Sequence, residues 1–389
     1  MRKAVIVSAV RTPLCKNNGD LADADAMNLA STVIREAVAR SKVDPENIEE
    51  VMFGNLRNRE YQTAGRVFGL GAGLPVSVPG ILLERACASS LTALAYASIF
   101  IEHGQGDCYV VGGVESCTNG VYTLARNRKN ANVHPGFAKN IFSPEDPYEN
   151  LNNGQTAERV AERFHITRED CDRFSYESHM KASEAEAEGR FDEHIVPVVI
   201  PNRKGAPKIV TKDTIYRPDC TMEALAKLPP AFMKGGIVTA GNSSPITDGA
   251  SAMVIMEESM AKAVGAEILG RCVAYQSAGC EPCIMGMGPM YATRKLMAKN
   301  GYTMDDFDLI EINEAFASQS VACLRELNAD MSRVNVNGGA IALGHPFTAS
   351  GGILTARALY ELRRRDLHRA LVTFCIGGGM GVSVVLERD

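Results

Sequence analysis

The chain has 389 residues and a net charge of −5, and hydrophobic residues make up 46% of it. This apolar content excludes a disordered chain, and the slight acidic excess argues against a protein that mainly binds nucleic acid. The eleven cysteines are scattered and odd in number, which indicates reduced thiols rather than a disulfide framework. No apolar run reaches the roughly 20 residues that cross a bilayer. We therefore expect a soluble cytoplasmic protein with neither a membrane nor a nucleic-acid partner.

Short β-branched runs alternate with helical patterns along the chain, which is typical of an α/β fold with parallel-containing sheets. Strands are predicted, in chain order, at Ala4–Val10, Val51–Gly54, Cys108–Gly112, Leu309–Ile312 and Ala370–Phe374. Between these strands, helices are predicted at Met27–Arg40, Ser89–His103, Tyr291–Lys299 and Gly352–Arg364.

The order and lengths of these elements repeat between the two ends of the chain, which indicates an ancient duplication. The alternative is that any α/β chain alternates helix and strand in this way. Residues 118–246 interrupt the pattern, because Asn, Pro and charged residues are frequent there. We predict an N-terminal half over residues 1–117 and 247–269, an inserted loop domain over 118–246, and a C-terminal half over 270–389. Loops on a rigid scaffold commonly supply substrate contacts.

Cys87 stands just before a predicted helix of small and apolar residues. A thiol at this position meets the positive end of the helix dipole and unpaired N–H groups. Both favour the thiolate, which is the nucleophilic form. The alternative is a packed core cysteine, because cysteine is among the most buried residue types.

Three further candidates stand beside glycines or at strand ends. His345 follows the glycine-rich run 337–344, where a backbone can approach a ligand closely and an imidazole could take a proton near neutral pH. Cys375 ends an apolar strand and precedes Gly377 and further glycines, a position that faces a crevice. Asn313 follows another predicted strand, where an amide can hold a water or an oxyanion. The alternatives are a structural histidine, a phosphate loop after the strand, and a helix-capping asparagine.

Two other motifs carry little weight. The CxxC at Cys280–Cys283 lacks both the strand-to-helix turn of a redox motif and the second ligand pair of a zinc site, so we interpret it as chance spacing. The glycine run 69–73 has no strand directly before it, so nucleotide binding is weakly supported. We expect no metal and no permanently bound cofactor.

Taken together, these segments make the chain resemble the thiolase family, and within it the biosynthetic acetyl-CoA acetyltransferases. The matching pieces run in family order over nearly the whole chain: residues 7–13, the Cys87 segment, 240–244, 285–289, the Asn313 and His345 segments, and 375–381. The resemblance implies duplicated α/β halves with mixed sheets in α-β-α-β-α layers, plus the inserted domain. It also implies coenzyme A as a substrate and a homo-oligomer, either a dimer or a tetramer.

The resemblance also implies a role for each candidate. Cys87 would carry the acyl group as a thioester, His345 would activate it, and Cys375 would move the proton at the α-carbon. His345 and a water held by Asn313 would form one oxyanion hole, and the backbone N–H groups of Cys87 and Gly377 a second. The implied contacts of coenzyme A and the acyl group are Arg217, Leu228, Phe232, Ala240, Ser244 and Met285. From the residues alone, the first of these is equally a solvated surface charge.

Two places beside the expected acyl site depart from the family pattern. Family members carry Met-Gly-x-Thr-Ala-Glu, preceded by His in the biosynthetic branch, where this chain has Asn152 and Asn153 before the glycine. Phe347 and Thr348 stand where the family has an apolar residue and a glycine. A buried amide without partners costs about 1–3 kcal/mol, so we expect both asparagines to be hydrogen-bonded to protein, water or substrate.

The sequence thus predicts a thiolase of lipid metabolism that interconverts two acyl-CoA molecules with 3-ketoacyl-CoA plus CoA by Claisen condensation, with acetyl-CoA as the acyl donor. The alternatives are a degradative 3-ketoacyl-CoA thiolase for longer or modified chains, a non-catalytic acyl-CoA-binding relative, and a thiol hydrolase. Binding alone needs no set of four reactive side chains, and hydrolysis would leave Cys375 without a use.

Overall fold

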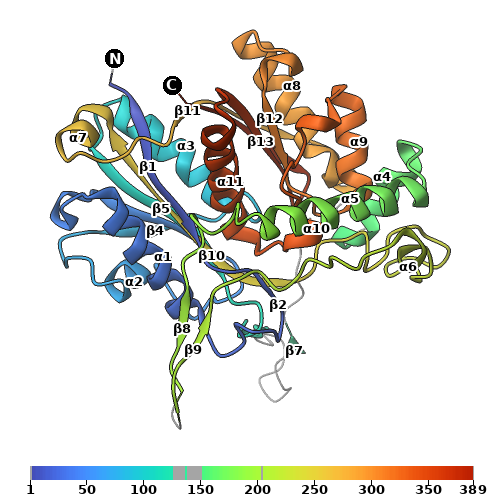
Figure 1. Cartoon of the computed structure of the whole chain (residues 1–389), viewed down its shortest axis with the longest axis horizontal. Coiled ribbons are helices and arrows are strands. Elements are labelled where there is room, and N and C mark those ends of the chain that lie inside the picture. Colours follow the sequence, from blue (N-terminus) through green and yellow to red (C-terminus); the bar gives the residue numbers. More distant parts are fainter. Residues whose placement is uncertain (1, 126–135, 138–150, 203–204, 389) are drawn as a thin grey trace.

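Two mixed β-sheets form the frame of the computed structural model, which describes residues 2–125, 136–137, 151–202 and 205–388 (Figure 1). The first sheet has the order β1-β10-β5-β3-β4, with β2 paired to β10, and the second has the order β11-β14-β13-β12. The first sheet contains β1 (Ala4–Arg11), β2 (Cys15–Lys16), β3 (Glu50–Asn55), β4 (Gly80–Leu82), β5 (Cys108–Glu115) and β10 (Thr247–Glu257). The second contains β11 (Arg271–Gly279), β12 (Leu309–Ile312), β13 (Arg369–Ile376) and β14 (Met380–Glu387).

Strand directions follow the same scheme in both sheets. In the first sheet β10 is antiparallel to β1 and β5, and β5 is parallel to β3. In the second sheet β14 is antiparallel to β11 and β13, and β13 is parallel to β12. The repetition seen in the sequence therefore extends to strand order and direction. The division of the chain into two halves and an insertion, with the boundaries given above, stays a prediction.

Helices form three layers around the two sheets (Figure 1). The helices concerned are α1 (Ala26–Ser41), α2 (Ala64–Gly71), α3 (Ser89–Glu102), α8 (Gly288–Asn300), α9 (Ala317–Leu327) and α11 (Ser350–Arg365). One apolar core joins α1 and α2 to the outer face of the first sheet, and another joins α8 and α9 to the outer face of the second. The largest core contains α3 and α11 between the sheets. The predicted α/β class with α-β-α-β-α layers is confirmed.

The sequence of α3 explains its central place. Ten of its residues are buried, and Ser, Ala, Leu and Ile occupy nearly every side of the helix. A helix that is apolar all round can be stable only when it is covered on all sides. By contrast, α1 has a narrower buried stripe and begins at Asp25, whose side chain accepts the N–H of Asn28.

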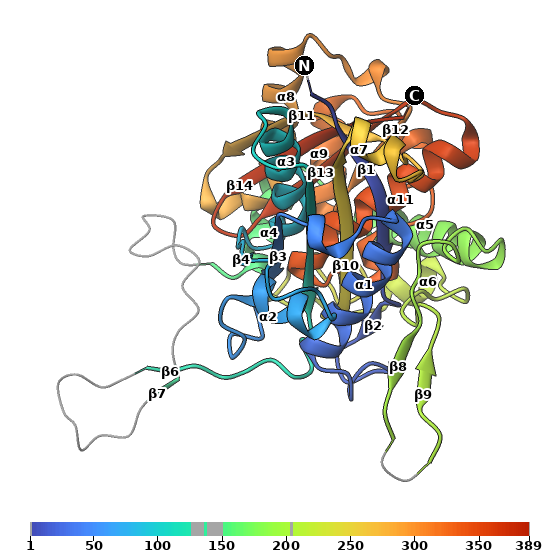
Figure 2. The ribbon, with the colours of Figure 1, turned by 90° about the vertical axis from the view of Figure 1, so that its left-hand side faces the viewer.

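The segment between β5 and β10 contains most of the remaining elements. These are β6 (Leu124–Ala125), β7 (Gly136–Phe137), α4 (Asn153–Arg163), α5 (Arg168–Ala187), β8 (Val198–Ile200), β9 (Lys208–Val210) and α6 (Met222–Ala226). The hairpin of β8 and β9 extends away from the two sheets (Figure 2). A buried ion pair attaches this segment to β1, because the Arg11 guanidinium contacts both oxygens of Asp213 at 2.6 and 2.7 Å.

Short helices complete the fold. They are η1 (Pro45–Asn47), α7 (Glu258–Ala263), η2 (Pro282–Met287), η3 (Met304–Asp306), η4 (Met331–Arg333), α10 (Ala340–Leu343) and η5 (Phe347–Ala349). Among the helices of the described residues, none combines the length and the apolar character that crossing a bilayer would need.

Candidate active site

Cys87 lies in a tight turn, two residues before α3 begins. Ala86, which precedes it, has a φ of 43°, a left-handed conformation that alanine seldom adopts. Burial raises the pKa of the Cys87 thiol to about 12, and a hydrogen bond from the backbone N–H of Gly377 opposes this effect. The thiolate expected from the helix start is therefore not the favoured form here, because lost hydration outweighs the nearby dipoles. A base must take the proton before Cys87 can act as a nucleophile.

His345 is a neutral base, and each of its ring nitrogens lies beside a polar side chain. Burial lowers its pKa to about 4, so the imidazole is uncharged at neutral pH. Its Nε2 lies 3.4 Å from the Asn313 amide nitrogen, and its Nδ1 lies 2.7 Å from the Ser350 hydroxyl. With the amide donating to Nε2, the ring proton resides on Nδ1 and is donated to Ser350. The backbone N–H of His345 donates to the Thr247 hydroxyl at 3.0 Å, which fixes the residue in place.

Asn313 directly follows β12 and is fully buried. It does not cap a helix, since α9 begins at Ala317 and Phe316 stands at its cap position. The capping alternative is therefore wrong. Within the described residues, the side-chain oxygen of Asn313 is buried and has no hydrogen-bond partner. This acceptor is available to a ligand or a water.

Cys375 and Gly377 mark the end of β13, next to Cys87. Cys375 is 1% exposed, and burial together with the neighbouring Cys87 thiol raises its pKa well above the usual value. The Cys375 thiol donates to the Oε1 atom of Gln319, with Sγ and oxygen 3.8 Å apart. Gly378 and Gly379 turn the chain into β14 with φ of 91° and 86°, a region that favours glycine. The structure thus brings two thiols and the Gly377 N–H to one place.

Cys375 also belongs to a small apolar cluster. It contains Ala157, Val238, Met285, Ala315 and Phe316, with Phe232 packed against it. The rings of Phe232 and Phe316 meet edge to face, with centroids 5.9 Å apart. Two of the residues predicted near the acyl group and CoA, Met285 and Phe232, therefore belong to the same cluster as Cys375.

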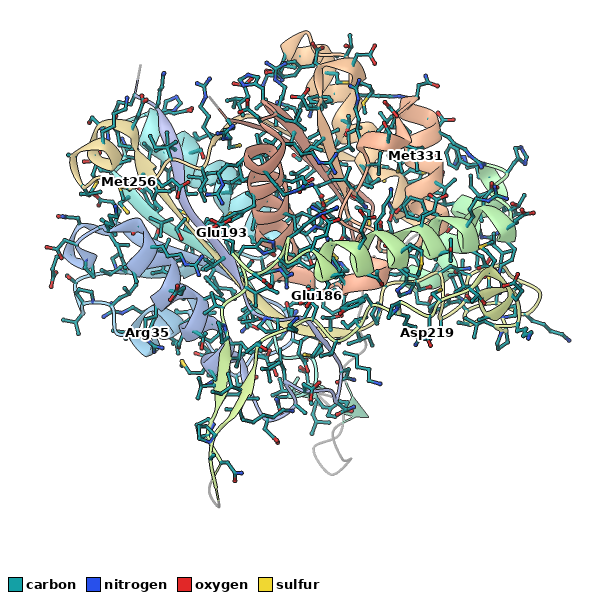
Figure 3. All side chains as sticks on the ribbon, in the orientation of Figure 1. Arg35, Glu186, Glu193, Asp219, Met256 and Met331 are labelled. Atoms are coloured by element: carbon teal, nitrogen blue, oxygen red, sulfur yellow. The ribbon has the colours of Figure 1, made fainter. Side chains whose placement is uncertain are left out.

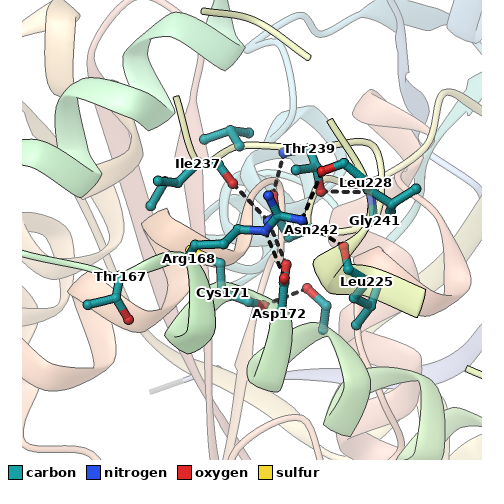
Figure 4. Close-up of polar contacts among 12 residues, drawn as sticks. Thr167, Arg168, Cys171, Asp172, Leu225, Leu228, Ile237, Thr239, Gly241 and Asn242 are labelled. Carbon is teal, nitrogen blue, oxygen red and sulfur yellow. Dashed lines mark hydrogen bonds and ion pairs between the residues drawn. The ribbon is translucent and has the colours of Figure 1, made fainter. Parts of the chain in front are cut away.

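A polar network attaches the segment after α6 to α5 (Figure 4). The Arg168 guanidinium donates to the carbonyl oxygens of Leu225 and Leu228 at 2.6 and 3.0 Å, and it pairs with Asp172 at 2.7 Å. The amide of Asn242 donates to the same carboxylate at 3.0 Å. Because Asp172 and Asn242 are buried, the network fixes the course of residues 225–242.

The remaining predicted CoA contacts differ in their surroundings. Ser244 donates its backbone N–H and its hydroxyl to the Ala315 carbonyl, both at 3.0 Å, which links it to the Cys375 cluster. Ala240 is exposed on the segment held by the network. Arg217 is exposed in an earlier part of the insertion, and its backbone N–H donates to the His179 ring at 3.2 Å. Asp219, two residues on, lies below α5 in Figure 3. No contact in the described residues joins the Arg217 side chain to Cys87 or Cys375.

Comparison with known proteins identifies the family. Residues 4–259 match the thiolase N-terminal domain, and residues 266–388 match the thiolase C-terminal domain. The chain belongs to the thiolase family. The predicted family and the predicted thiolase activity, that of an acyltransferase, are thereby confirmed.

Full-length relatives of this thiolase have one recurring name. Acetyl-CoA acetyltransferase of Pseudomonas aeruginosa is 43% identical over 100% of both chains. The solved Bacillus anthracis acetyl-CoA acetyltransferase is 39% identical, with a TM-score of 0.94 over 100% of this chain and 99% of that one. Human mitochondrial 3-ketoacyl-CoA thiolase is 35% identical, with a TM-score of 0.92 over the same shares.

Two buried glutamates of this thiolase escaped the sequence analysis. Glu314 accepts hydrogen bonds from Ser178, Asn335 and the backbone N–H of Ile341, at 2.7, 2.7 and 3.1 Å. These contacts fix the glycine-rich segment that leads to His345. The sequence did contain one signal for Glu314, because this acidic residue directly follows Asn313 and precedes apolar residues.

Glu115, the second of these glutamates, contacts one of the departures from the family pattern. It accepts the backbone N–H groups of Leu56 and Arg57, both at 3.0 Å, and the Thr348 hydroxyl at 2.8 Å. Burial raises the pKa of Glu115 to about 7, although these donors oppose the shift. The Glu115 carboxylate in turn raises the pKa of Cys87.

The other three departures from the family pattern, Asn152, Asn153 and Phe347, differ in the contacts they make. Asn152 caps α4: its side chain accepts the N–H of Gln155, and the Gln155 side chain accepts the N–H of Asn152, both at 3.0 Å. The Asn153 side chain makes no hydrogen bond within the described residues. The Phe347 ring stands edge-on to His345, with centroids 5.3 Å apart. Protein atoms therefore satisfy the first asparagine but not the second.

Proposed function

We propose that this thiolase is an acetyl-CoA C-acetyltransferase, which converts two molecules of acetyl-CoA into acetoacetyl-CoA and CoA and catalyses the reverse reaction. The observation that carries the proposal is the pair of neighbouring buried thiols, Cys87 and Cys375. The family resemblance assigns His345, whose imidazole is neutral, as the base of the same site. One thiol can form a thioester while the other exchanges a proton with carbon. The names of the full-length relatives support acetyl as the acyl group.

In the first half-reaction, Cys87 attacks the thioester carbonyl of acetyl-CoA. His345 takes the thiol proton, the carbonyl oxygen becomes an oxyanion, and the proton then goes to the sulfur of departing CoA. The Gly377 N–H, which already hydrogen-bonds to Cys87, is placed to stabilise charge at this point. The product is acetyl-Cys87 and free CoA.

In the second half-reaction, Cys375 first gives its thiol proton to His345, and the resulting thiolate takes a proton from the α-carbon of a second acetyl-CoA. The resulting enolate attacks the carbonyl of acetyl-Cys87, a carbon–carbon bond forms, and the Cys87 sulfur leaves. The free acceptor of Asn313 supports a water that, together with His345, stabilises the enolate oxygen. Return of the proton from His345 to the Cys87 sulfur restores the starting state, in which both cysteines are thiols.

Coenzyme A enters and leaves as a substrate in this proposal, and no cofactor stays bound. Its pantetheine would pass Leu228, Ala240 and Ser244, on the segment that the Arg168 network holds. Phe232 would border the chain and Met285 the acyl group, because both belong to the Cys375 cluster. Arg217 would face the nucleotide end. We also infer a cytoplasmic homo-oligomer, a dimer or a tetramer, from the family resemblance.

A CoA-dependent cleavage assay over a series of 3-ketoacyl-CoA chain lengths tests this function. We expect acetoacetyl-CoA to be cleaved to two acetyl-CoA only when free CoA is added. Release of a free acid without CoA would indicate a hydrolase. Preference for long chains would indicate a degradative thiolase, and saturable binding without turnover a non-catalytic relative.

A further inference from the structure

Gln319 lies in the first turn of α9, fully buried beside Cys375. Its Oε1 accepts the hydrogen bond of the Cys375 thiol, with the heavy atoms 3.8 Å apart. The other end of the amide, Nε2, is also buried, and it has no hydrogen-bond partner within the described residues. A buried donor without a partner is unfavourable and rare, so a partner that forms only during the reaction would explain it.

Packing fixes the stem of this side chain but not its terminal amide. A Cβ atom added at Gly286 would lie only 2.8 and 2.9 Å from Cγ and Cβ of Gln319, so η2 presses directly against the stem. The other thiol beside this amide is Cys323, one turn further along α9, and it donates to the carbonyl oxygen of Gly286 at 3.3 Å. The Gln319 amide opposes the burial that raises the pKa of Cys323 to about 12, but it does not meet the geometry of a hydrogen bond to that sulfur. The terminal torsion of a glutamine is soft, so the amide can turn while its stem stays in place.

This inference rests on the proposed function, in which Cys375 alternates between thiol and thiolate. The thiol needs an acceptor and the thiolate needs a donor, and a carboxamide offers both at one position. We propose that Gln319 is the positioning residue for Cys375. Its Oε1 accepts a hydrogen bond from the thiol, and its Nε2–H donates a hydrogen bond to the sulfur once the thiol proton has left.

The proton balance of this step is simple. When an S–H bond of Cys375 breaks, a C–H bond forms at the α-carbon of the enolate, and the electron pair of the broken bond stays on sulfur. The reverse transfer regenerates the thiol. In a buried site the thiolate has lost its hydration, and a hydrogen bond to an ionised acceptor is about twice as strong as a neutral one. Gln319 thus acts through Cys375 and forms no bond to substrate.

The substitution Gln319→Met tests the role, because methionine has a similar volume but neither an amide donor nor an amide acceptor. Two rates are measured: acetylation of Cys87 by acetyl-CoA, and exchange of the α-protons of acetyl-CoA with deuterium from solvent, followed by NMR. We expect acetylation to stay within about threefold and exchange to fall by about 10- to 100-fold, the scale of a hydrogen bond to a charged group. A purely structural role would lower both rates together.

Ser320→Ala is the matched control on the same helix, since this buried hydroxyl donates to the Phe316 carbonyl at 3.2 Å and has no other hydrogen-bond partner among the described residues. We expect it to leave both rates unchanged. Equal loss of both rates in Gln319→Met, or no loss of exchange, would overturn the inference alone. If Cys375→Ser, measured in parallel, exchanged α-protons as fast as the parent enzyme, the proposed role of Cys375 itself would fail.

Discussion

Glu115 and Cys375 occupy matching places in the two sheets. Each lies on the strand that has a parallel neighbour on one side and an antiparallel neighbour on the other. Glu115 pairs with Gly249 on β10, and Cys375 pairs with Gly381 on β14; each of these glycines is followed two residues later by a serine. The two halves therefore present a polar side chain at the same point of the same framework.

The hydrogen bonds of the two places differ. Glu115 has three donors around its carboxylate, and the Asn55 side chain at the end of β3 forms two hydrogen bonds with the backbone of Asn58. In the second half, the Asn313 oxygen after β12 and the Gln319 nitrogen beside Cys375 lack partners within the described residues. Satisfied polar side chains build turns, whereas unsatisfied buried ones retain capacity for substrate. The first sheet thus uses these strand ends for structure, and the second sheet retains them for chemistry.

The largest effect is expected at Cys375, where loss of turnover would distinguish a chemical role from a structural one. We expect Cys375→Ser to lose turnover by about 10²-fold or more while still acetylating Cys87, because a serine hydroxyl is a much weaker acid than a thiol with a pKa of about 8.5. Single-turnover acetylation and steady-state cleavage of acetoacetyl-CoA provide the two rates. Equal loss of both would make Cys375 a structural residue like Glu115, and the contrast between the halves would disappear.

Glu115→Gln should instead lower stability. Both carboxylate oxygens accept backbone N–H groups, so one end of the new amide would present its own N–H to a donor. We expect a loss of about 1–3 kcal/mol in the free energy of unfolding, measured by denaturant titration, with acetylation of Cys87 retained. A stable Glu115→Gln variant that fails to acetylate Cys87 would show instead that the first half also contributes chemistry.

The pH dependence of that loss gives a second test. Burial raises the pKa of Glu115 from 4.5 to about 7, so the folded state binds this proton more tightly than the unfolded chain does. The resulting stabilisation is complete below about pH 4.5 and is lost as the pH rises through about 7. The deficit of Glu115→Gln relative to wild type should therefore be larger near pH 5 than near pH 8. A deficit that grows with pH would contradict the raised pKa.

The smallest changes in stability are expected at the two adjacent asparagines, Asn152 and Asn153. Asn152→Ala removes a satisfied helix cap and should cost about 1 kcal/mol of stability without changing acyl preference. Asn153→Met should change stability by less than about 0.5 kcal/mol but alter kcat/KM for acetoacetyl-CoA relative to longer and hydroxylated 3-ketoacyl-CoAs. If wild type barely turned over acetoacetyl-CoA and Asn153→Met rescued it, the acetyl-transfer assignment would be wrong.

The candidates that could be predicted from sequence have a local signal. Asn313 and Cys375 follow or end apolar strands, His345 follows a glycine-rich run, and Cys87 precedes an apolar helix. Each of these placements depends on neighbours in the chain, so residue type and spacing were enough to single out the candidates, whereas their roles came from the family resemblance. The alternation of strands and helices likewise predicted the α/β class, whereas the family resemblance implied the layers.

The contacts that could not be predicted join distant parts of the chain. Glu115 accepts the N–H of Arg57 from 58 residues away, and Arg11 pairs with Asp213 from 202 residues away. The ionisation state of the Cys87 thiol was predicted wrongly for a related reason. The helix start near Cys87 suggested an easily formed thiolate, but burial in the folded chain decides its pKa, and burial leaves no mark at a single position.

The central claim is that the first half carries the acyl group on Cys87 while the second half supplies the base and moves the proton. The most direct test is incubation of the enzyme with acetyl-CoA, followed by rapid quenching, proteolysis and peptide mass spectrometry. We expect one acetyl group per chain, on the peptide that contains Cys87, in wild type and in Cys375→Ser alike. Acetylation at another cysteine, or an active enzyme with no acetylated peptide, would contradict it.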